Sequence, residues 1–261
     1  MGNSASYFYG VRMLSNNEAK LIRSLHRKKG REKEKIFLVE GEKLVREALL
    51  FGEVLLVAGV REALEKLEVE PSLLRETQDR VMQKITSLQN HCGVLALVAM
   101  RNNTLDVNYT AEHFSLMIDG IRDPGNLGTI IRIADWFGIP QLLVSEDTVD
   151  VFNPKVTQAS MGSIFRVRVV ECDLAQCIAG CRTVSPEYEI AVTVLNGEDA
   201  IGSGWKSARA VVVGNEAFGV RNQLVTMADH KITIRGSGQA ESLNAAVSCG
   251  IICHEWINLR N

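Results

Sequence analysis

The chain has 261 residues and a formal net charge of −2 at pH 7, with 46% hydrophobic and 23% charged residues. Both fractions lie near the averages of globular proteins, which excludes a disordered, collagen-like or coiled-coil protein. Its apolar stretches, such as residues 93–100, are far shorter than the roughly 18 residues that a membrane-spanning helix needs. The first ten residues lack the apolar core of a secretory signal, and we expect a cytoplasmic protein that does not enter the membrane.

The first hundred residues alternate between short apolar runs and amphipathic stretches, a pattern that predicts a small α/β layer domain. We expect strands at residues 36–40, 54–58, 73–74 and 93–100, and helices at residues 16–28, 42–50, 61–67 and 78–85. Residues 1–100 are therefore assigned to an N-terminal domain. Residues 101–113 begin with a polar segment without periodicity and are expected to form a linker.

Residues 114–261 restart the alternation with longer apolar runs. We expect strands at residues 114–119, 141–145, 165–170, 188–194, 210–214 and 231–234, and a last helix at residues 242–259. The runs are nearly continuous in Val, Ile and Leu, which is typical of strands that are covered on both faces. The sequence therefore predicts a second α/β domain, with a mostly parallel sheet and helices on both faces.

Basic residues are concentrated near the N-terminus. Residues 20–35 hold eight Lys or Arg side chains and two acidic ones, whereas residues 101–261 carry 13 basic and 18 acidic side chains. A basic run of this kind is either a solvated helix face or a surface that contacts phosphates. The candidate phosphate-contacting residues are Arg27, Lys28, Lys29, Arg31 and Lys33.

The six cysteines include no CxxC pair, which argues against a zinc knuckle. Cys249, Cys253 and His254 could share one helix face, but their apolar surroundings favour buried thiols. We expect reduced structural cysteines and no bound metal, because thiols stay reduced in the cytosol.

Three loops that follow predicted strands carry polar residues and glycines, at residues 119–132, 211–219 and 234–244. Ligands of parallel sheets bind at the carboxyl ends of the strands, so these loops are the candidate site. None contains a P-loop or a GxGxxG fingerprint. Arg132 lies in an apolar run, where a buried guanidinium would need a partner; the alternative is a surface Arg on the polar stripe of a helix.

Together the three loops resemble the sequence motifs of the SpoU (TrmH-type) 2′-O-ribose RNA methyltransferases, a branch of the SPOUT superfamily. The first motif is matched by Asn126, Gly128 and Arg132, the second by Gly214, Asn215, Glu216 and Gly219, and the third by Ser242, Leu243 and Asn244. The departures from the family pattern are Thr233, Ile234, Ala217 and the Ala245–Ala246 pair. None of them removes a polar residue that is expected to act.

The resemblance implies a deep trefoil knot in the second domain and a pocket for S-adenosylmethionine. The residues that it implies for cofactor binding are Thr193, Leu195, Gly214, Asn215, Gly219, Ile234 and Leu243. Those that it implies for catalysis are Arg132, Asn126, Glu216, Ser242 and Asn244. Because the pKa of an arginine side chain exceeds about 12, we expect Arg132 to orient the ribose 2′-hydroxyl and to stabilise the developing oxyanion rather than to act as the base.

The resemblance further implies that the knotted domains pair as a homodimer and that the N-terminal domain, similar to a ribosomal-protein-type α/β sandwich, docks RNA. The basic residues named above, together with Lys155, are then candidate RNA contacts. The extra domain favours rRNA over tRNA as the substrate. Two other classes are alternatives: a non-catalytic RNA-binding or ribosome-assembly protein that retains the fold, and a small-molecule or dinucleotide enzyme, which the missing glycine fingerprint disfavours.

Overall fold

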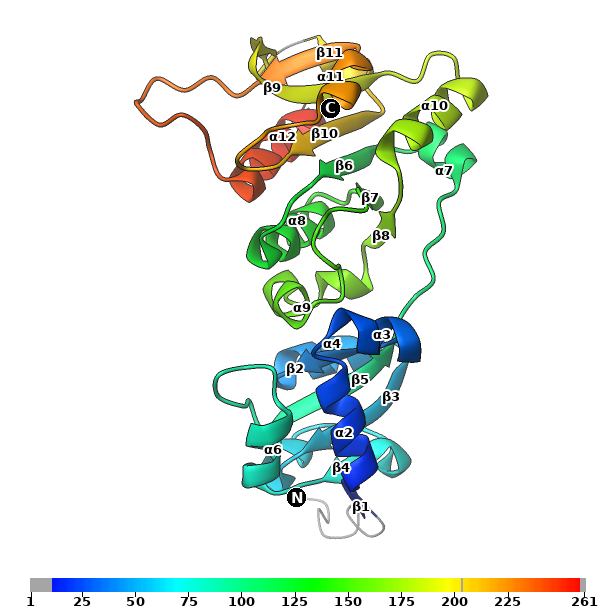
Figure 1. The fold of residues 1–261 in the computed structure, drawn as a ribbon, viewed down its shortest axis with the longest axis vertical. Helices are drawn as coiled ribbons and strands as arrows, with labels where there is room; N and C mark the ends of the chain where they lie inside the picture. The colour runs from blue at the N-terminus through cyan, green and yellow to red at the C-terminus, as the bar shows by residue number, and fades with distance from the viewer. Residues whose placement is uncertain (1–10, 203, 259–261) are drawn as a thin grey trace. The chain divides into compact units, whose positions relative to one another are not determined.

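The computed structural model describes residues 11–202 and 204–258, so the N-terminal decapeptide considered above lies outside the described residues. The chain forms two compact units (Figure 1). Unit 1 comprises the residues up to Arg101 together with Phe152–Phe165, and unit 2 comprises Asn102–Val151 and the residues from Arg166 onward. No helix within the described ranges has both the length and the apolar character that crossing a bilayer requires.

Unit 1 is built on a five-stranded mixed sheet in the order β1-β4-β3-β5-β2. The strands are β1 (Arg12–Met13), β2 (Ile36–Glu40), β3 (Val54–Gly59), β4 (Leu74–Glu76) and β5 (Val94–Ala99). Strand β5 runs antiparallel to both of its neighbours, whereas β4 is parallel to β1 and β3. The four strands that were expected are present, because their apolar runs are buried in the core of the unit.

The helices of unit 1 surround this sheet. They are α2 (Asn16–Ser24), α3 (Lys28–Glu34), α4 (Glu42–Phe51), α5 (Arg61–Leu64) and α6 (Asp79–Ile85), with a 3₁₀ turn η1 (Pro71–Leu73). The helix expected at residues 16–28 therefore ends early and is followed by a second one. Arg27 has an extended backbone between the two helices, and Gly30 permits their close packing: a Cβ atom there would come within 2.1 Å of the Ser24 carbonyl oxygen.

Residues 152–165, which were expected in the second domain, pack in unit 1. They form helix α9 (Pro154–Ser160) and the 3₁₀ turn η2 (Ser163–Phe165), and α9 packs against β2. The ring of Phe152 lies 4.8 Å from that of Phe37, centroid to centroid, and the Phe37 and Phe165 rings are 5.9 Å apart. These aromatic contacts explain why the segment joins the core of unit 1.

Unit 2 contains a six-stranded sheet in the order β11-β9-β10-β6-β7-β8, in which all neighbouring strands are parallel. The strands are β6 (Ser115–Asp119), β7 (Gln141–Val144), β8 (Arg168–Glu171), β9 (Ile190–Asp199), β10 (Ala210–Gly214) and β11 (His230–Thr233). The central strands β6, β7 and β10 are buried along their whole length, as their continuous apolar sequences predict.

Helices flank this sheet. They are α7 (Val107–Glu112), α8 (Pro124–Trp136), α10 (Leu174–Val184), α11 (Asn222–Thr226) and α12 (Ala245–Asn258), with a 3₁₀ turn η3 (Trp205–Ser207). Helices α7, α10 and α11 share one apolar core with the sheet, and α8 packs against α12. Helix α7 forms within the segment expected to be a linker, because Asp106 caps it and Val107 and Ala111 supply apolar contacts.

Candidate active site

The site begins at the carboxyl ends of two neighbouring central strands, β6 and β10. Asp119 and Gly214 are register partners at the ends of these strands, so the loop that leads into α8 and the loop that follows β10 start side by side. From this pair the chain continues to β7 and β8 on one side, while β9 and β11 lie on the other. A change of direction of this kind marks the crevice where parallel sheets bind ligands.

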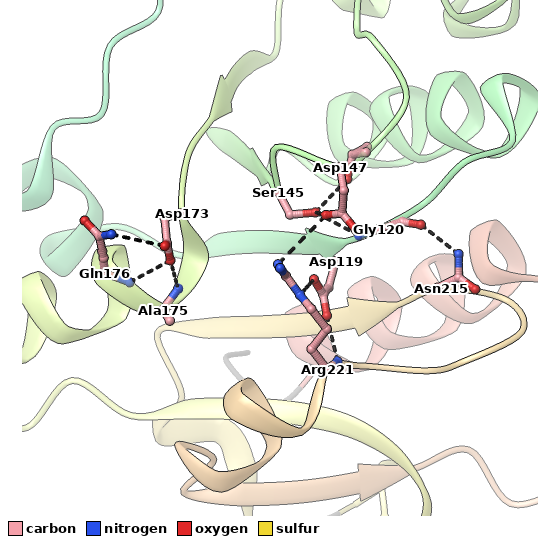
Figure 2. Close-up of polar contacts among 10 residues, drawn as sticks. Asp119, Gly120, Ser145, Asp147, Asp173, Ala175, Gln176, Asn215 and Arg221 are labelled. Atoms are coloured by element: carbon pink, nitrogen blue, oxygen red, sulfur yellow. Dashed lines mark hydrogen bonds and ion pairs between the residues drawn. The ribbon is translucent and has the colours of Figure 1, made fainter.

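An ion pair between a buried carboxylate and a half-exposed arginine lies at this point of the sheet (Figure 2). The Asp119 carboxylate, only 1% exposed, accepts a 2.6 Å hydrogen bond from the Arg221 Nε atom at Oδ1 and a 2.7 Å bond from the Arg221 backbone N–H at Oδ2. Neither residue was among the predicted site residues. The available signal was an Asp at the end of an apolar strand, since a buried carboxylate requires a partner.

The loop after β10 is held by the side chain of Asn215. Its Nδ2 atom donates to the Gly120 carbonyl oxygen at 2.7 Å, and its Oδ1 atom accepts from the backbone N–H groups of Ala217 and Phe218. Backbone hydrogen bonds between Asn215 and Gly219 close the loop at its base. The loop is therefore fixed both to itself and to the end of β6.

Gly214 is required by this close turn. A Cβ atom on Gly214 would lie 2.2 Å from the carbonyl carbon of Gly219 and 2.3 Å from the backbone nitrogen of Val220. Any other residue would thus overlap the returning backbone of the loop. Gly219 has a φ of 69°, a left-handed conformation that also favours glycine.

One chain of hydrogen bonds joins the three motifs. The Asn126 Nδ2 atom donates to Glu216 Oε1 at 2.5 Å, and the Asn244 Nδ2 atom donates to Asn126 Oδ1 at 2.9 Å. Both residues are held at helix N-termini: the backbone N–H of Asn126 donates to the capping Asp123 of α8, and Asn244 Oδ1 accepts from the N–H groups of Ala246 and Val247 in the first turn of α12. Residues 90 and 118 positions apart are thereby brought together in one polar cluster.

A second polar cluster lies at the end of β7 (Figure 2). Ser145 accepts a hydrogen bond from the Gly120 N–H at 2.9 Å and donates to Asp147 Oδ1 at 2.7 Å. The Ser145 hydroxyl, together with the positive charges of Arg221 and Arg122, lowers the pKa of Asp147. Asp147 is therefore an anion at neutral pH, and it balances part of the charge of Arg221, whose Nη2 atom is 4.0 Å away.

Arg132 is exposed on α8, so the sequence argument that it would be buried and need a partner is wrong. The buried stripe of the helix is formed by Leu127, Ile130, Ile131 and Ala134, and the 3.6-residue period places Arg132 outside it. No residue in the described part of the chain forms a hydrogen bond or an ion pair with Arg132. Its guanidinium thus faces solvent in the single chain, as does the indole of Trp136, which is 83% exposed.

The residues predicted for cofactor binding come from strand β9, from the end of β10 and from the loops after β10 and β11. Thr193 donates to the Val212 carbonyl oxygen at 3.1 Å and so ties β9 to β10. Leu195 and Leu243 are exposed and Ile234 is half-buried. Apolar side chains beside loop backbone suit an uncharged adenosine, which needs apolar walls and a few backbone hydrogen bonds. Ser242 is exposed and makes no hydrogen bond to the cluster of Asn126, Glu216 and Asn244 within the described residues.

The predicted basic surface is present, with one exception. Arg27, Lys28, Lys29, Lys33 and Lys155 are exposed. Arg31 is 2% exposed, and its Nη1 atom donates to the Leu25 carbonyl oxygen at 2.6 Å, so it supports the turn between α2 and α3 instead of facing a phosphate. Two of the lysines have acidic neighbours: Lys28 lies 3.7 Å from Glu32, and a hydrogen bond to Glu34 raises the pKa of Lys33.

Comparison with known proteins places this geometry in a family. The family model described as the SpoU rRNA Methylase family matches residues 113–254, and the model described as the MRM3-like substrate binding domain matches residues 16–96. The chain belongs to the SpoU rRNA methylase family. The resemblance read from the three motifs is thereby confirmed, and so is the expected fold class, apart from the knot, which stays a prediction.

Relatives of this SpoU family member match over nearly the whole chain. It is 31% identical over 251 residues to the Bacillus subtilis 23S rRNA (guanosine(2553)-2′-O)-methyltransferase RlmP, covering 94% of this chain and 97% of the relative. A TrmH-family protein from Porphyromonas gingivalis superposes with a TM-score of 0.82 at 30% identity, covering 94% and 98% of the two chains. An AdoMet-bound rRNA methyltransferase from Sinorhizobium meliloti superposes with a TM-score of 0.80 at 29% identity, covering 95% and 97%.

Proposed function

We propose that this SpoU family member transfers a methyl group from S-adenosylmethionine to a ribose 2′-hydroxyl of ribosomal RNA. The observation that carries the proposal is the hydrogen-bond chain from Glu216 through Asn126 to Asn244, which joins one polar residue from each family motif. The 23S rRNA 2′-O-methyltransferase activity for which the Bacillus subtilis relative is named and the AdoMet bound to the Sinorhizobium meliloti relative support the same reaction and cofactor.

Strand β9 and the loops after β10 and β11 would hold the cofactor. Leu195, Ile234 and Leu243 offer apolar side chains, and Gly214 belongs to a loop whose shape is fixed by Asn215 and by the turn at Gly219. Bound S-adenosylmethionine would supply an electrophilic methyl group on its sulfonium. The role of the protein is then to hold that methyl group in line with the ribose hydroxyl and to keep water away from it.

The side chains of the polar cluster would orient the ribose. A 2′-hydroxyl is a weak nucleophile that must lose its proton as it attacks, so a positioned donor for the developing oxyanion is needed. Arg132 is suited to this role because its guanidinium is exposed and no described residue neutralises it. Asn126, Glu216, Ser242 and Asn244 would orient the hydroxyl and the nucleotide, with the proton leaving through a neighbouring group or a phosphate.

We further propose that two copies of unit 2 pair as a homodimer, with Arg132 reaching the site of the partner copy. Helices α8 and α12 pack together, and they expose Trp136 and Val247. Exposed apolar side chains on two packed helices favour an interface. A monomeric preparation with full activity in analytical ultracentrifugation at the assay concentration would contradict the shared site.

Unit 1 would dock the RNA. Its match to a substrate-binding family model, over residues 16–96, is joined by the exposed cations Arg27, Lys28, Lys29 and Lys33, with Lys155 on α9. Side chains of this type neutralise phosphates and release counterions, which gives binding that weakens steeply with salt. The cytoplasmic location expected from the sequence stays a prediction.

The proposal is tested by methyl transfer to defined RNAs. The purified chain is incubated with tritiated S-adenosylmethionine and with unmodified transcripts of 23S rRNA, 16S rRNA and a tRNA, and the label retained in RNA is counted. We expect transfer to 23S rRNA, loss of transfer in Asn126→Ala, and normal transfer in Asn17→Ala, an exposed control on α2. If the chain binds the cofactor with micromolar affinity in calorimetry but methylates none of these RNAs, the proposal that ribosomal RNA is the methyl acceptor is wrong. Absence of cofactor binding by the folded chain would favour the non-catalytic RNA-binding protein.

A further inference from the structure

One aromatic side chain stands out in the loop after β10. Phe218 is 83% exposed, although it lies two residues from Glu216, which is hydrogen-bonded to Asn126. A phenyl ring has no polar group that would favour solvent exposure, and burying it would release ordered water. A solvent-facing ring in the loop that carries Glu216 is therefore available to a partner that approaches the candidate catalytic cluster.

The loop presents this ring on a fixed backbone. The N–H of Phe218 donates to Asn215 Oδ1 at 3.2 Å, and Asn215 is tied to Gly120 at the end of β6. On the other side of the loop, the backbone N–H of Arg221 is held by the buried Asp119. Because both ends of the loop are tied to the sheet, little backbone freedom is lost when the ring meets a partner.

The surroundings of the ring favour a nucleobase over a protein surface. Its exposed sequence neighbours are Ala217 and Gly219, which are small, and the charged Glu216 and Arg221. A protein interface needs a fully buried apolar core made by several side chains, and this loop offers one ring among small and charged residues. An unstacked base needs only one flat π surface, and RNA-binding proteins commonly supply it with an aromatic side chain.

We propose that Phe218 is the stacking platform for an unpaired base of the RNA substrate, at the modified nucleotide or next to it. The stack would fix the base while the cluster of Asn126, Glu216 and Asn244 orients the ribose. This inference rests on the proposed function and adds a substrate-positioning residue outside the polar residues of the three motifs. It also implies that the target nucleotide lies in a single-stranded or opened region of the RNA.

Two variants of Phe218 distinguish the effect of a flat aromatic ring from the effect of apolar side-chain volume. Phe218→Leu keeps an apolar side chain without a ring, and Phe218→Trp keeps a flat ring. The matched control is Phe51→Leu, at an exposed Phe of α4 in unit 1. Each is assayed for kcat and KM with the 23S rRNA transcript, for cofactor affinity by calorimetry, for RNA affinity by filter binding, and for oligomeric state by sedimentation.

We expect Phe218→Leu to lower kcat/KM for RNA roughly 5- to 150-fold, the range typical for loss of one base stack. Cofactor affinity and oligomeric state should be unchanged, and Phe218→Trp and Phe51→Leu should retain most of the activity. Ultraviolet cross-linking of the native chain to the transcript, followed by mass spectrometry, should yield a peptide cross-linked at Phe218.

The remaining outcomes distinguish the stacking role of Phe218 from the proposed methyltransferase function. If Phe218→Leu has the native kcat/KM and methyl transfer is intact, the stacking role is wrong and the proposed function is unaffected. A loss of activity accompanied by dissociation of the oligomer means that a second copy covers the ring, which also overturns the platform. If the native chain binds no RNA, both proposals are wrong. If RNA cross-links to Phe218 but no methyl group is transferred, the stacking role is supported and the proposed methyltransferase activity is wrong.

Discussion

The Nε atom of Arg221 lies 2.6 Å from the Oδ1 atom of Asp119, at the point where β6 and β10 end side by side. In many parallel sheets this crevice receives the ligand. Here the chain's own ion pair lies at the crevice and links the loop after β10 to the neighbouring strand. Of the residues that suit a cofactor, Leu195 and Ile234 belong to β9 and to the end of β11, on the side of β10 away from β6, whereas Gly214 lies beside the ion pair itself.

Replacing Arg221 and replacing Asp119 should lower the free energy of unfolding by different amounts. Arg221→Met leaves the buried Asp119 carboxylate with the backbone N–H alone, and we expect a loss of about 1–3 kcal/mol in the free energy of unfolding. Asp119→Asn leaves the half-exposed Arg221 side chain, which water can solvate, and should cost less. The double variant should be more stable than Arg221→Met. Urea unfolding of the four proteins measures the coupling, and additive losses would show that the pair does not act as a unit.

Gly214→Ala tests the close turn of the same loop. The new Cβ atom would overlap the Gly219 and Val220 backbone, so the loop must move or the strand must shift. Overlap of this kind typically costs about 1–3 kcal/mol of stability, and we expect cofactor affinity to fall at least tenfold because the loop no longer has its native shape. The matched control is Gly204→Ala, where the added atom meets open space. Unchanged cofactor binding in a folded Gly214→Ala protein would contradict the role of this loop.

Much of the fold could be predicted from the sequence because continuous apolar runs and their turns are local signals. Strand β2 begins and ends where it was expected, at residues 36–40. The features that were missed depend on contacts between distant residues. The break between α2 and α3 arises where Gly30 meets Ser24, and helix α7 forms within the expected linker because Val107 packs in the core of unit 2.

In the candidate site too, features with a local sequence signal were predictable and features that depend on contacts between distant residues were not. The three motifs are visible in the sequence. The hydrogen bonds from Asn126 to Glu216 and Asn244, however, join residues that are 90 and 118 positions apart, and no local sequence pattern predicts such contacts. The burial of Arg31 was also not predictable from its basic neighbours, since it depends on the Leu25 carbonyl oxygen that the turn presents to it. The exposure of Arg132, by contrast, follows from helical periodicity once the buried stripe of α8 is known.

Arg132→Lys should separate charge from geometry in the proposed reaction. Lysine keeps the positive charge but lacks the planar fork of donors that can hold a hydroxyl and a developing oxyanion together. We expect kcat to fall roughly 100- to 1,000-fold, the usual effect of losing one oxyanion donor, with cofactor affinity unchanged. Single-turnover methyl transfer at saturating RNA measures this step. Near-native turnover would exclude a special role for the guanidinium.

The exposed cations of unit 1 should govern how RNA binding depends on salt. Each phosphate contact that is lost lowers the slope of log K against log salt concentration by about 0.7–0.9, so a variant with Arg27, Lys28, Lys29 and Lys33 all changed to Ala should bind more weakly and with a flatter slope. Lys66→Ala, at an exposed lysine outside this set, serves as the control. Arg31→Ala should instead destabilise unit 1, because the buried Leu25 carbonyl oxygen loses its donor. Filter binding of the 23S rRNA transcript between roughly 50 and 300 mM KCl measures the salt slope. Urea unfolding measures the stability of Arg31→Ala. An unchanged slope in the four-residue variant would mean that these side chains form a solvated helix face and that RNA docks elsewhere.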